Sequence, residues 1–175
     1  MATREGSQSV LVVVDVQTGV VASAHRRDEV VAKISAVVEK ARRANTPVVW
    51  VQHSDAELVE GSPEWALVPE LSPHDDDNRI GKHFNSAFEE TPLSSLLASL
   101  GASKIFLAGA ATNWCIRATA YAALERGYDV SLIADAHTTG SPHAAELIED
   151  LNTALRWLSY PGRKNESLTT DELSF

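Results

Sequence analysis

Three side chains that together could carry out nucleophilic catalysis lie far apart in the chain: Asp15, Lys82 and Cys115. A thiol can attack a carbonyl carbon, a carboxylate can act as a general base, and an ammonium can stabilise developing charge. Asp15 directly follows the apolar run 10–14, and Cys115 lies a few residues beyond the run 104–108. Because ligands of open α/β sheets bind beyond the carboxyl ends of the strands, we expect these groups to meet there.

Cys115 is the only cysteine, and the sequence predicts that it lies at the start of a helix. The free N–H groups of a helix N-terminus usually lower a thiol pKa from its free value of about 8.5, and they can also bind an oxyanion. The run 109–114 before the thiol is small and polar, so a substrate could approach the backbone closely. The alternative interpretation is an inert core cysteine.

Asp15 and Lys82 each have a functional and a structural interpretation. Asp15 could take the thiol proton and later deliver it to a leaving nitrogen, or it could be a turn or helix-capping residue. No helical pattern begins at Asp15, which weakens the capping alternative. Lys82 follows residues 79–81, a candidate short strand, and could pair with Asp15 and lower the thiol pKa. Its alternative is a solvent-exposed lysine.

Four short, nearly continuous apolar segments must position these groups. Such segments are typical of parallel strands covered on both faces. They are residues 10–14, 48–52, 104–108 and 129–134. Helical patterns alternate with them, which favours a three-layer α/β/α fold, a doubly wound (Rossmann-like) parallel sheet with helices on both faces.

The expected helices are marked by apolar periodicity and by start and stop residues. One covers residues 30–41, and a second covers 93–100 between Pro92 and Gly101. A third runs from 114 to 126 and ends at Gly127. For the fourth, the pattern predicts Ser141 as the N-cap with Pro142 in the first turn.

In two segments the apolar residues follow no clear period. Residues 54–79 contain three prolines and an acidic run, which predicts a long irregular loop with a helical turn near Trp65. Loops of this length are uncommon unless they are functional. Residues 160–175 are polar and could form a loose tail or a final edge strand.

Composition limits the class of protein. The 175 residues predict a single domain, 1–175, and the 44% hydrophobic and 22% charged residues are typical of a globular chain. A net charge of −9 disfavours binding to nucleic acids and anionic membranes. The early apolar run is too short for a signal peptide or a membrane span, and one cysteine allows no internal disulfide, so we expect a cytoplasmic protein.

Nucleotide cofactors are not indicated. The only glycine shortly after the first strand is Gly19, so the chain has neither a Walker loop nor a GxGxxG fingerprint. We therefore expect no cofactor and a small-molecule substrate.

Together, these segments resemble the isochorismatase-like cysteine hydrolase family, and the resemblance extends over nearly the whole chain. The segment Asp15-Val16-Gln17 after an apolar strand resembles the family's opening motif. Residues 82–88, which end in Ser-Ala-Phe, are similar to its lysine motif. Residues 109–115 with 118–120 resemble its nucleophile motif. Asp135-Ala136 and the closing segment 169–173 also fit, which makes the last segment part of the fold.

The resemblance implies a six-stranded parallel sheet and a catalytic triad. In that reading Cys115 is the nucleophile, Asp15 the general base, and Lys82 the charge that supports both. The backbone N–H groups of Ala111 and Cys115 would form the oxyanion hole, and the peptide bond before Ala111 is often cis in the family. Relatives are usually oligomers, so we expect a homo-oligomer. Gln17, Phe84 and Trp114 are candidate substrate-binding residues, with structural roles as their alternatives.

The chain departs from the family's metal-binding members, the nicotinamidases. They carry an Asp-x-His pair and further histidines after the second strand. Here the order is reversed, His53 before Asp55, and the next histidine is only His74. Because this spacing is loose for a metal site, we expect none.

The expected activity is hydrolysis of a small amide or related C–N bond through a Cys115 thioester. Hydrolysis of isochorismate or a similar vinyl ether is an alternative, because no residue can be tied to either substrate. A non-catalytic, oligomer-forming member of the fold is a third, because fold does not imply function.

Overall fold

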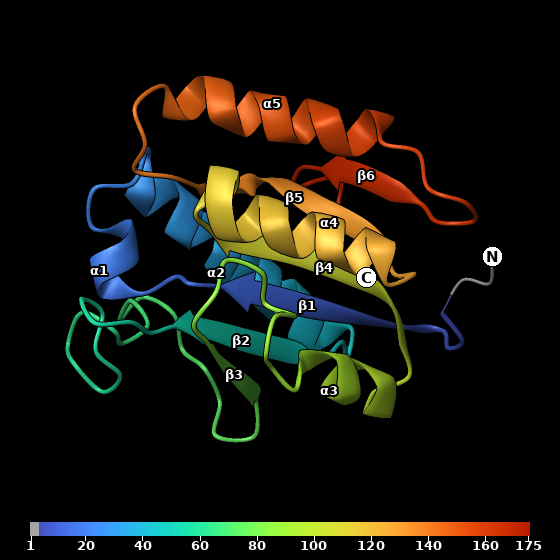
Figure 1. The fold of residues 1–175 in the computed structure, drawn as a ribbon, viewed down its shortest axis with the longest axis horizontal. Helices are drawn as coiled ribbons and strands as arrows, with labels where there is room; N and C mark the ends of the chain where they lie inside the picture. The colour runs from blue at the N-terminus through green and yellow to red at the C-terminus, as the bar shows by residue number, and fades with distance from the viewer. Residues whose placement is uncertain (1–3) are drawn as a thin grey trace.

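Six strands form one parallel sheet in the computed structural model, which describes residues 4–175 (Figure 1). The strands are β1 (Gln8–Val14), β2 (Val48–His53), β3 (Asn78–Lys82), β4 (Ala102–Ala110), β5 (Asp129–Thr138) and β6 (Asn165–Leu168). Their order across the sheet is β3-β2-β1-β4-β5-β6, and all five pairings are parallel. The predicted doubly wound fold and the six-stranded sheet are confirmed.

Helices cover both faces of this sheet (Figure 1). They are α1 (Thr18–Val21), α2 (Arg27–Arg43), α3 (Leu93–Ser99), α4 (Arg117–Glu125) and α5 (Ala144–Trp157). Buried residues of α2 pack on one face, and those of α3, α4 and α5 on the other. In the part of the chain that the structure describes, no helix has the length and apolar character needed to cross a membrane.

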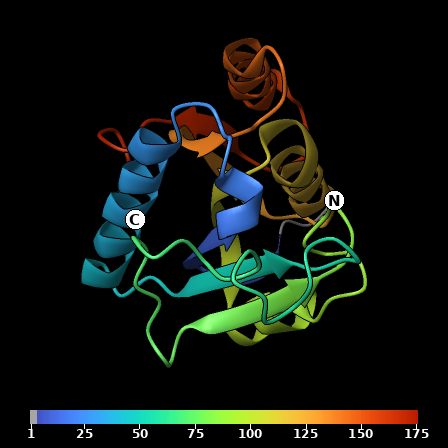
Figure 2. The ribbon, with the colours of Figure 1, turned by 90° about the vertical axis from the view of Figure 1, so that its left-hand side faces the viewer.

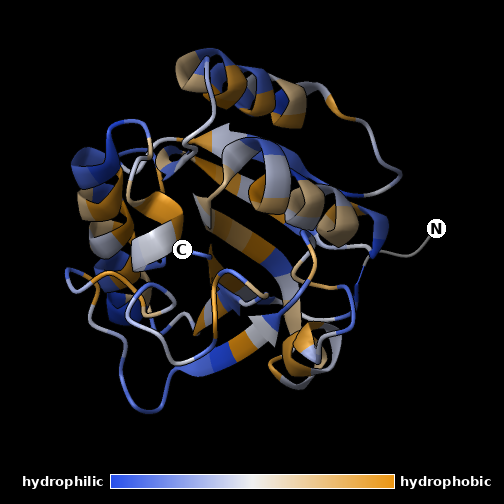
Figure 3. Cartoon of the chain, turned by 60° about the vertical axis from the view of Figure 1, so that its left-hand side comes forward, coloured by the Kyte–Doolittle hydropathy of each residue, from blue (hydrophilic) through white to orange (hydrophobic). Residues whose placement is uncertain are grey.

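The strands are almost continuously apolar because each of them serves two cores. Successive side chains of a strand point to opposite faces. In β1, Val10, Val12 and Val14 pack beneath α3 and α4, whereas Leu11 and Val13 pack beneath α2. Apolar residues are accordingly concentrated in the strands and on the inner sides of the helices (Figure 3).

The sheet reverses its direction of growth between β1 and β4. The chain adds β2 and β3 on one side of β1, and then β4, β5 and β6 on the other. Figure 2 looks onto the edge of the sheet where the strands end, with α1 in front of it. This switch point is where α/β sheets bind ligands. At this edge Gly109 (φ +124) passes so close to β1 that a Cβ atom there would overlap the Val14 carbonyl oxygen.

The two aperiodic segments differ in structure. Residues 54–77 form neither helix nor strand, and one turn around Trp65 is closed by the Ala66 N–H donating to the Ser62 carbonyl. The closing segment contains β6 and then packs beside α2, where the Phe175 ring lies 4.5 Å from that of Phe106. The prediction that the closing segment belongs to the fold is confirmed.

Two predicted helix starts are wrong, and one short helix was not predicted. The fourth helix begins at Ala144 rather than behind Ser141, because the Ser141 side chain bonds to Thr139 and Asn113 instead of capping a helix. The third begins as a π-helical turn, Thr112–Ile116, and becomes α-helical only at Arg117. The short helix α1 follows Asp15 closely, where no helix was expected.

Candidate active site

Asp15 terminates β1 at the switch point. Its backbone is left-handed (φ 53), a conformation that Asp tolerates better than most residues, and its N–H donates to the Val51 carbonyl of β2 at 2.8 Å. The side chain is 2% exposed, and its Oδ2 lies 2.7 Å from Nζ of Lys82. Within residues 4–175, the buried Oδ1 has no hydrogen-bond partner. This oxygen is therefore free to accept a proton.

Lys82, the last residue of β3, joins the carboxylate to the thiol. Its side chain is as buried as that of Asp15. Nζ donates to the Phe84 carbonyl at 3.0 Å and lies 3.4 Å from Sγ of Cys115. The alternative interpretation of a solvent-exposed lysine is wrong, and the structure brings all three predicted residues together.

Cys115 lies in the π-helical turn Thr112–Ile116 directly beyond β4, and it is the free, half-buried thiol of the cluster. The peptide bond between Ala110 and Ala111, just before this turn, is cis. The Ala111 carbonyl accepts the N–H groups of Trp114 and Ile116, each at 3.1 Å, on either side of Cys115. The turn thus carries the thiol and the backbone of Ala111 on one short segment.

Burial sets the electrostatics of the pair. Desolvation raises the pKa of Asp15, and the charge of Lys82 and its hydrogen bond only partly oppose this. Desolvation and the negative charge of Asp15 raise the pKa of the Cys115 thiol to about 11. The prediction that a helix start lowers the thiol pKa is therefore wrong, because desolvation and a neighbouring carboxylate outweigh the effect of the helix start. In the resting site the thiol of Cys115 is therefore protonated, and the raised pKa of Asp15 makes its carboxylate a stronger base.

This electrostatic arrangement predicts how alkylation of Cys115 depends on pH. Iodoacetamide reacts with the thiolate, so the rate should still be rising at about pH 10 and should stay below that of a free thiol near neutrality. Intact mass follows the reaction without ambiguity because the chain has one cysteine. Glutathione alkylated under the same conditions is the control. A plateau near or below about pH 8.5 would contradict a desolvated resting thiol.

The segment after Lys82 is pinned to the helix that follows the nucleophile. The Ala87 N–H donates to Oγ1 of Thr119 at 2.9 Å, and Thr119 is 1% exposed. This bond joins the lysine motif to the nucleophile motif. Asn85 lies on the same segment, and its Oδ1 lies 4.0 Å from Sγ of Cys115. Asn85 was not among the predicted site residues, although its place inside the lysine motif was a signal for it.

The three candidate substrate-binding residues occupy different environments. Gln17 is buried, and its amide donates to the carbonyls of His53 and Trp65 while its Oε1 accepts the His53 N–H. Its amide therefore ties β1 to β2 and to the irregular loop, which is the structural alternative. Phe84 and Trp114 are 46% and 58% exposed next to Lys82 and Cys115, so both rings are available to a ligand.

His53 and Asp55 are engaged with each other and with the site. His53 Nε2 lies 3.0 Å from Oδ2 of Asp55, and His53 Nδ1 lies 3.4 Å from Nζ of Lys82. Oδ1 of Asp55 accepts the N–H groups of Glu57 and Leu58. In residues 4–175, the one group of three side chains spaced to hold a metal is His74, Asp76 and Asp77, beside the start of β2 and away from the thiol. That site is empty.

Comparison with known proteins gives a consistent result. The family model of the isochorismatase domain matches residues 9–155. The secreted isochorismatase effector Isc1 of Verticillium dahliae is 30% identical, over 77% of this chain and 75% of its own. The ureidoacrylate amidohydrolase RutB of Methylorubrum extorquens is 28% identical, over 96% of this chain and 86% of its own.

A solved structure has the same architecture. The crystal structure of an isochorismatase family protein superposes with a TM-score of 0.83 at 27% identity, over 92% of this chain and 98% of that one.

Proposed function

The chain belongs to the isochorismatase family and is a hydrolase, and we propose that it hydrolyses a small amide or related C–N bond through a Cys115 thioester. The observation that carries the proposal is the buried Asp15–Lys82–Cys115 cluster, with contacts of 2.7 and 3.4 Å at the switch point of the sheet. The relative named as a ureidoacrylate amidohydrolase supports C–N chemistry, because its similarity extends over nearly the whole chain.

The first half of the reaction begins with proton transfer. As substrate displaces water from the thiol, Oδ1 of Asp15 takes the Sγ proton, and the thiolate forms a bond to the carbonyl carbon. The backbone N–H groups of Ala111 and Cys115 stabilise the resulting oxyanion. The C–N bond then breaks, and the leaving nitrogen takes the proton from Asp15. This step leaves an acyl thioester on Cys115 and releases the amine.

The second half returns the enzyme to its starting state. Asp15 takes a proton from water, and the hydroxide forms a bond to the thioester carbon. The C–S bond breaks, the acid leaves, and the thiolate regains its proton from Asp15. The ammonium of Lys82 keeps a carboxylate of raised pKa ionised in the resting site and neutralises the thiolate as it forms.

The side chains around the thiol limit which substrates fit the site. Phe84 and Trp114 could hold a small planar group from either side, with Asn85 contributing an amide near the sulfur.

The exposure of Phe84 and Trp114 also favours self-association of the chain, which sedimentation would measure. A nucleophilic thiol must stay reduced, which favours the cytoplasm as the working compartment.

A substrate panel tests the proposal. The purified protein is incubated with ureidoacrylate, maleamate, nicotinamide and isochorismate, while ammonia release and consumption of isochorismate are followed. We expect ammonia from at least one amide, and rapid quenching should give an intact mass raised by the acyl group on Cys115. Turnover of isochorismate alone would assign the vinyl-ether reaction instead. Absence of both turnover and adduct would indicate a non-catalytic member of the family.

A further inference from the structure

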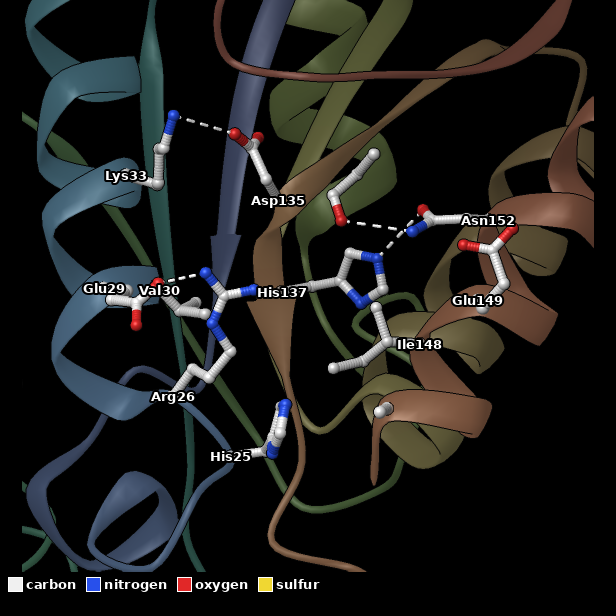
Figure 4. Close-up of a pocket in the computed structure, with 12 residues that line it drawn as sticks. His25, Arg26, Glu29, Val30, Lys33, Asp135, His137, Ile148, Glu149 and Asn152 are labelled. Carbon is white, nitrogen blue, oxygen red and sulfur yellow. Dashed lines mark hydrogen bonds and ion pairs between the residues drawn. The ribbon is translucent and has the colours of Figure 1, made fainter. Parts of the chain in front are cut away.

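A cavity of about 260 Å³ lies between α2 and α5 at the end of β5 (Figure 4). Four of its charged residues form two ion pairs, Arg26 with Glu29 and Lys33 with Asp135 at 3.0 Å. Glu149 also lines the cavity, so one negative charge remains, which by itself does not define a ligand. The distinctive feature is a buried histidine in the wall, His137, which the mechanism does not use.

His137 is held by Asn152 of α5. The amide Nδ2 of Asn152 donates to the Ala134 carbonyl at 3.1 Å, which fixes the orientation of the side chain (Figure 4). Oδ1 of Asn152 therefore faces His137 Nε2 at 3.1 Å, and it also accepts the hydroxyl of Ser167 on β6 at 2.7 Å. The arrangement spans α5, β5 and β6.

This network determines the tautomer of His137. Because Oδ1 can only accept, Nε2 must carry the hydrogen. Burial lowers the pKa of His137 to about 4, so the ring is neutral near pH 7 and its Nδ1 is an acceptor. The hydroxyl of Thr112 lies 2.9 Å from Nδ1, and it must be the donor. Every bond in the chain from Ser167 to Thr112 thus has one allowed direction.

Thr112 is the first residue of the π-helical turn that carries Cys115, and its side chain is fully buried. Its hydroxyl bond to His137 therefore attaches the start of the nucleophile turn to β5. An apolar pair at these positions would pack but would not fix the rotation of the turn, because hydrogen bonds are directional and dispersion contacts are not.

We propose that His137, oriented by Asn152, is a positioning residue that holds the Cys115 turn in register with Asp15 and Lys82 through the Thr112 hydroxyl. This role rests on the proposed function, because it assumes that Cys115 is the nucleophile. The three side chains Thr112, His137 and Asn152 touch no reacting atom and act only through the turn.

The variants Thr112→Val and Thr112→Ser separate the hydroxyl from packing. Valine keeps the shape and removes the donor, whereas serine keeps the donor. In Thr112→Val the freed turn should expose the thiol, so alkylation by iodoacetamide at about pH 8 should accelerate about tenfold, the change expected from a fall of one unit in the thiol pKa. For the amide turned over fastest, kcat should fall about tenfold with KM little changed. Thr112→Ser should retain the wild-type values of both.

Ser131→Ala is the matched control. It removes a different buried hydroxyl, one on β5 that donates to Glu166, and should lower the melting temperature without changing alkylation or kcat. The proposal is overturned if Thr112→Val alkylates no faster than wild type, if Thr112→Ser behaves like the valine variant, or if Ser131→Ala accelerates alkylation equally. Alkylation needs no substrate, so these outcomes remain distinct from failure of the amide panel.

Discussion

Replacing Cys115 with alanine is expected to abolish amide hydrolysis, with a loss of about 10⁴-fold or more in kcat. No other group within reach can form the covalent bond, because Asp15 and Lys82 are almost fully buried and paired with each other. Cys115 is half-buried and small, so the variant should fold. Steady-state ammonia release measures the effect, and a thermal melt checks the fold.

Cys115→Ser sharpens this test because it keeps the size of the side chain. A hydroxyl beside a carboxylate is a much weaker nucleophile than a thiol, so this variant should also be inactive or form an acyl adduct that accumulates slowly. Retention of more than about a tenth of the wild-type kcat by the alanine variant would remove Cys115 from the mechanism. Activity in both variants with no covalent adduct in wild type would point to direct attack by water.

Most of the sheet could be predicted because its central strands are almost continuously apolar and must therefore be buried. A continuously apolar segment such as 10–14 must be covered on both faces, and a strand covered on both faces requires helices on both sides. Gly101 and Gly127 adopt positive φ angles at the predicted helix ends, as the sequence indicated. These features depend on local residue types, so a single sequence reveals them.

Strand lengths and helix starts depended on partners that are distant in sequence. β5 continues to Thr138 because its register shifts against β4, so that Gly109 pairs with His137. Residues 135–138 are mixed in polarity, and nothing in their own pattern predicts a strand. Ser141 has the residue type of an N-cap, but its hydroxyl bonds to Asn113 in the nucleophile turn and to Thr139. Tertiary hydrogen bonds overrode local preference in both places.

The site itself was predictable in position but not in electrostatics. Reactive residues beyond strand ends had to meet because parallel strands share one edge. The sign of the thiol pKa shift required the burial of Cys115 and the distance to its neighbours, which residue types do not specify. Desolvation of the thiol and the negative charge of Asp15 together outweigh the charge of Lys82 and the roughly half charge of a helix terminus, so the thiol pKa is raised.

Replacing Lys82 with methionine is expected to lower kcat/KM about 10³-fold and to destabilise the fold by about 3 kcal/mol. The variant leaves the Asp15 carboxylate buried without its cation, which raises the carboxyl pKa further. Asp15 is then protonated in the resting enzyme and cannot accept the thiol proton. The acidic limb of the pH–rate profile should therefore move to higher pH, so that residual activity is recovered as the pH rises.

The double variant Asp15→Asn/Lys82→Met separates charge from packing. Asparagine preserves the shape of Asp15 and tolerates its left-handed backbone, so the neutral pair should recover much of the lost stability. It should recover no activity, because it contains no base. A kcat/KM for Lys82→Met within about tenfold of wild type would show that the ammonium is not needed for chemistry. If the single and double variants are equally unstable, neutralising Asp15 does not restore stability. The stability lost in Lys82→Met would then come from the packing of the lysine side chain.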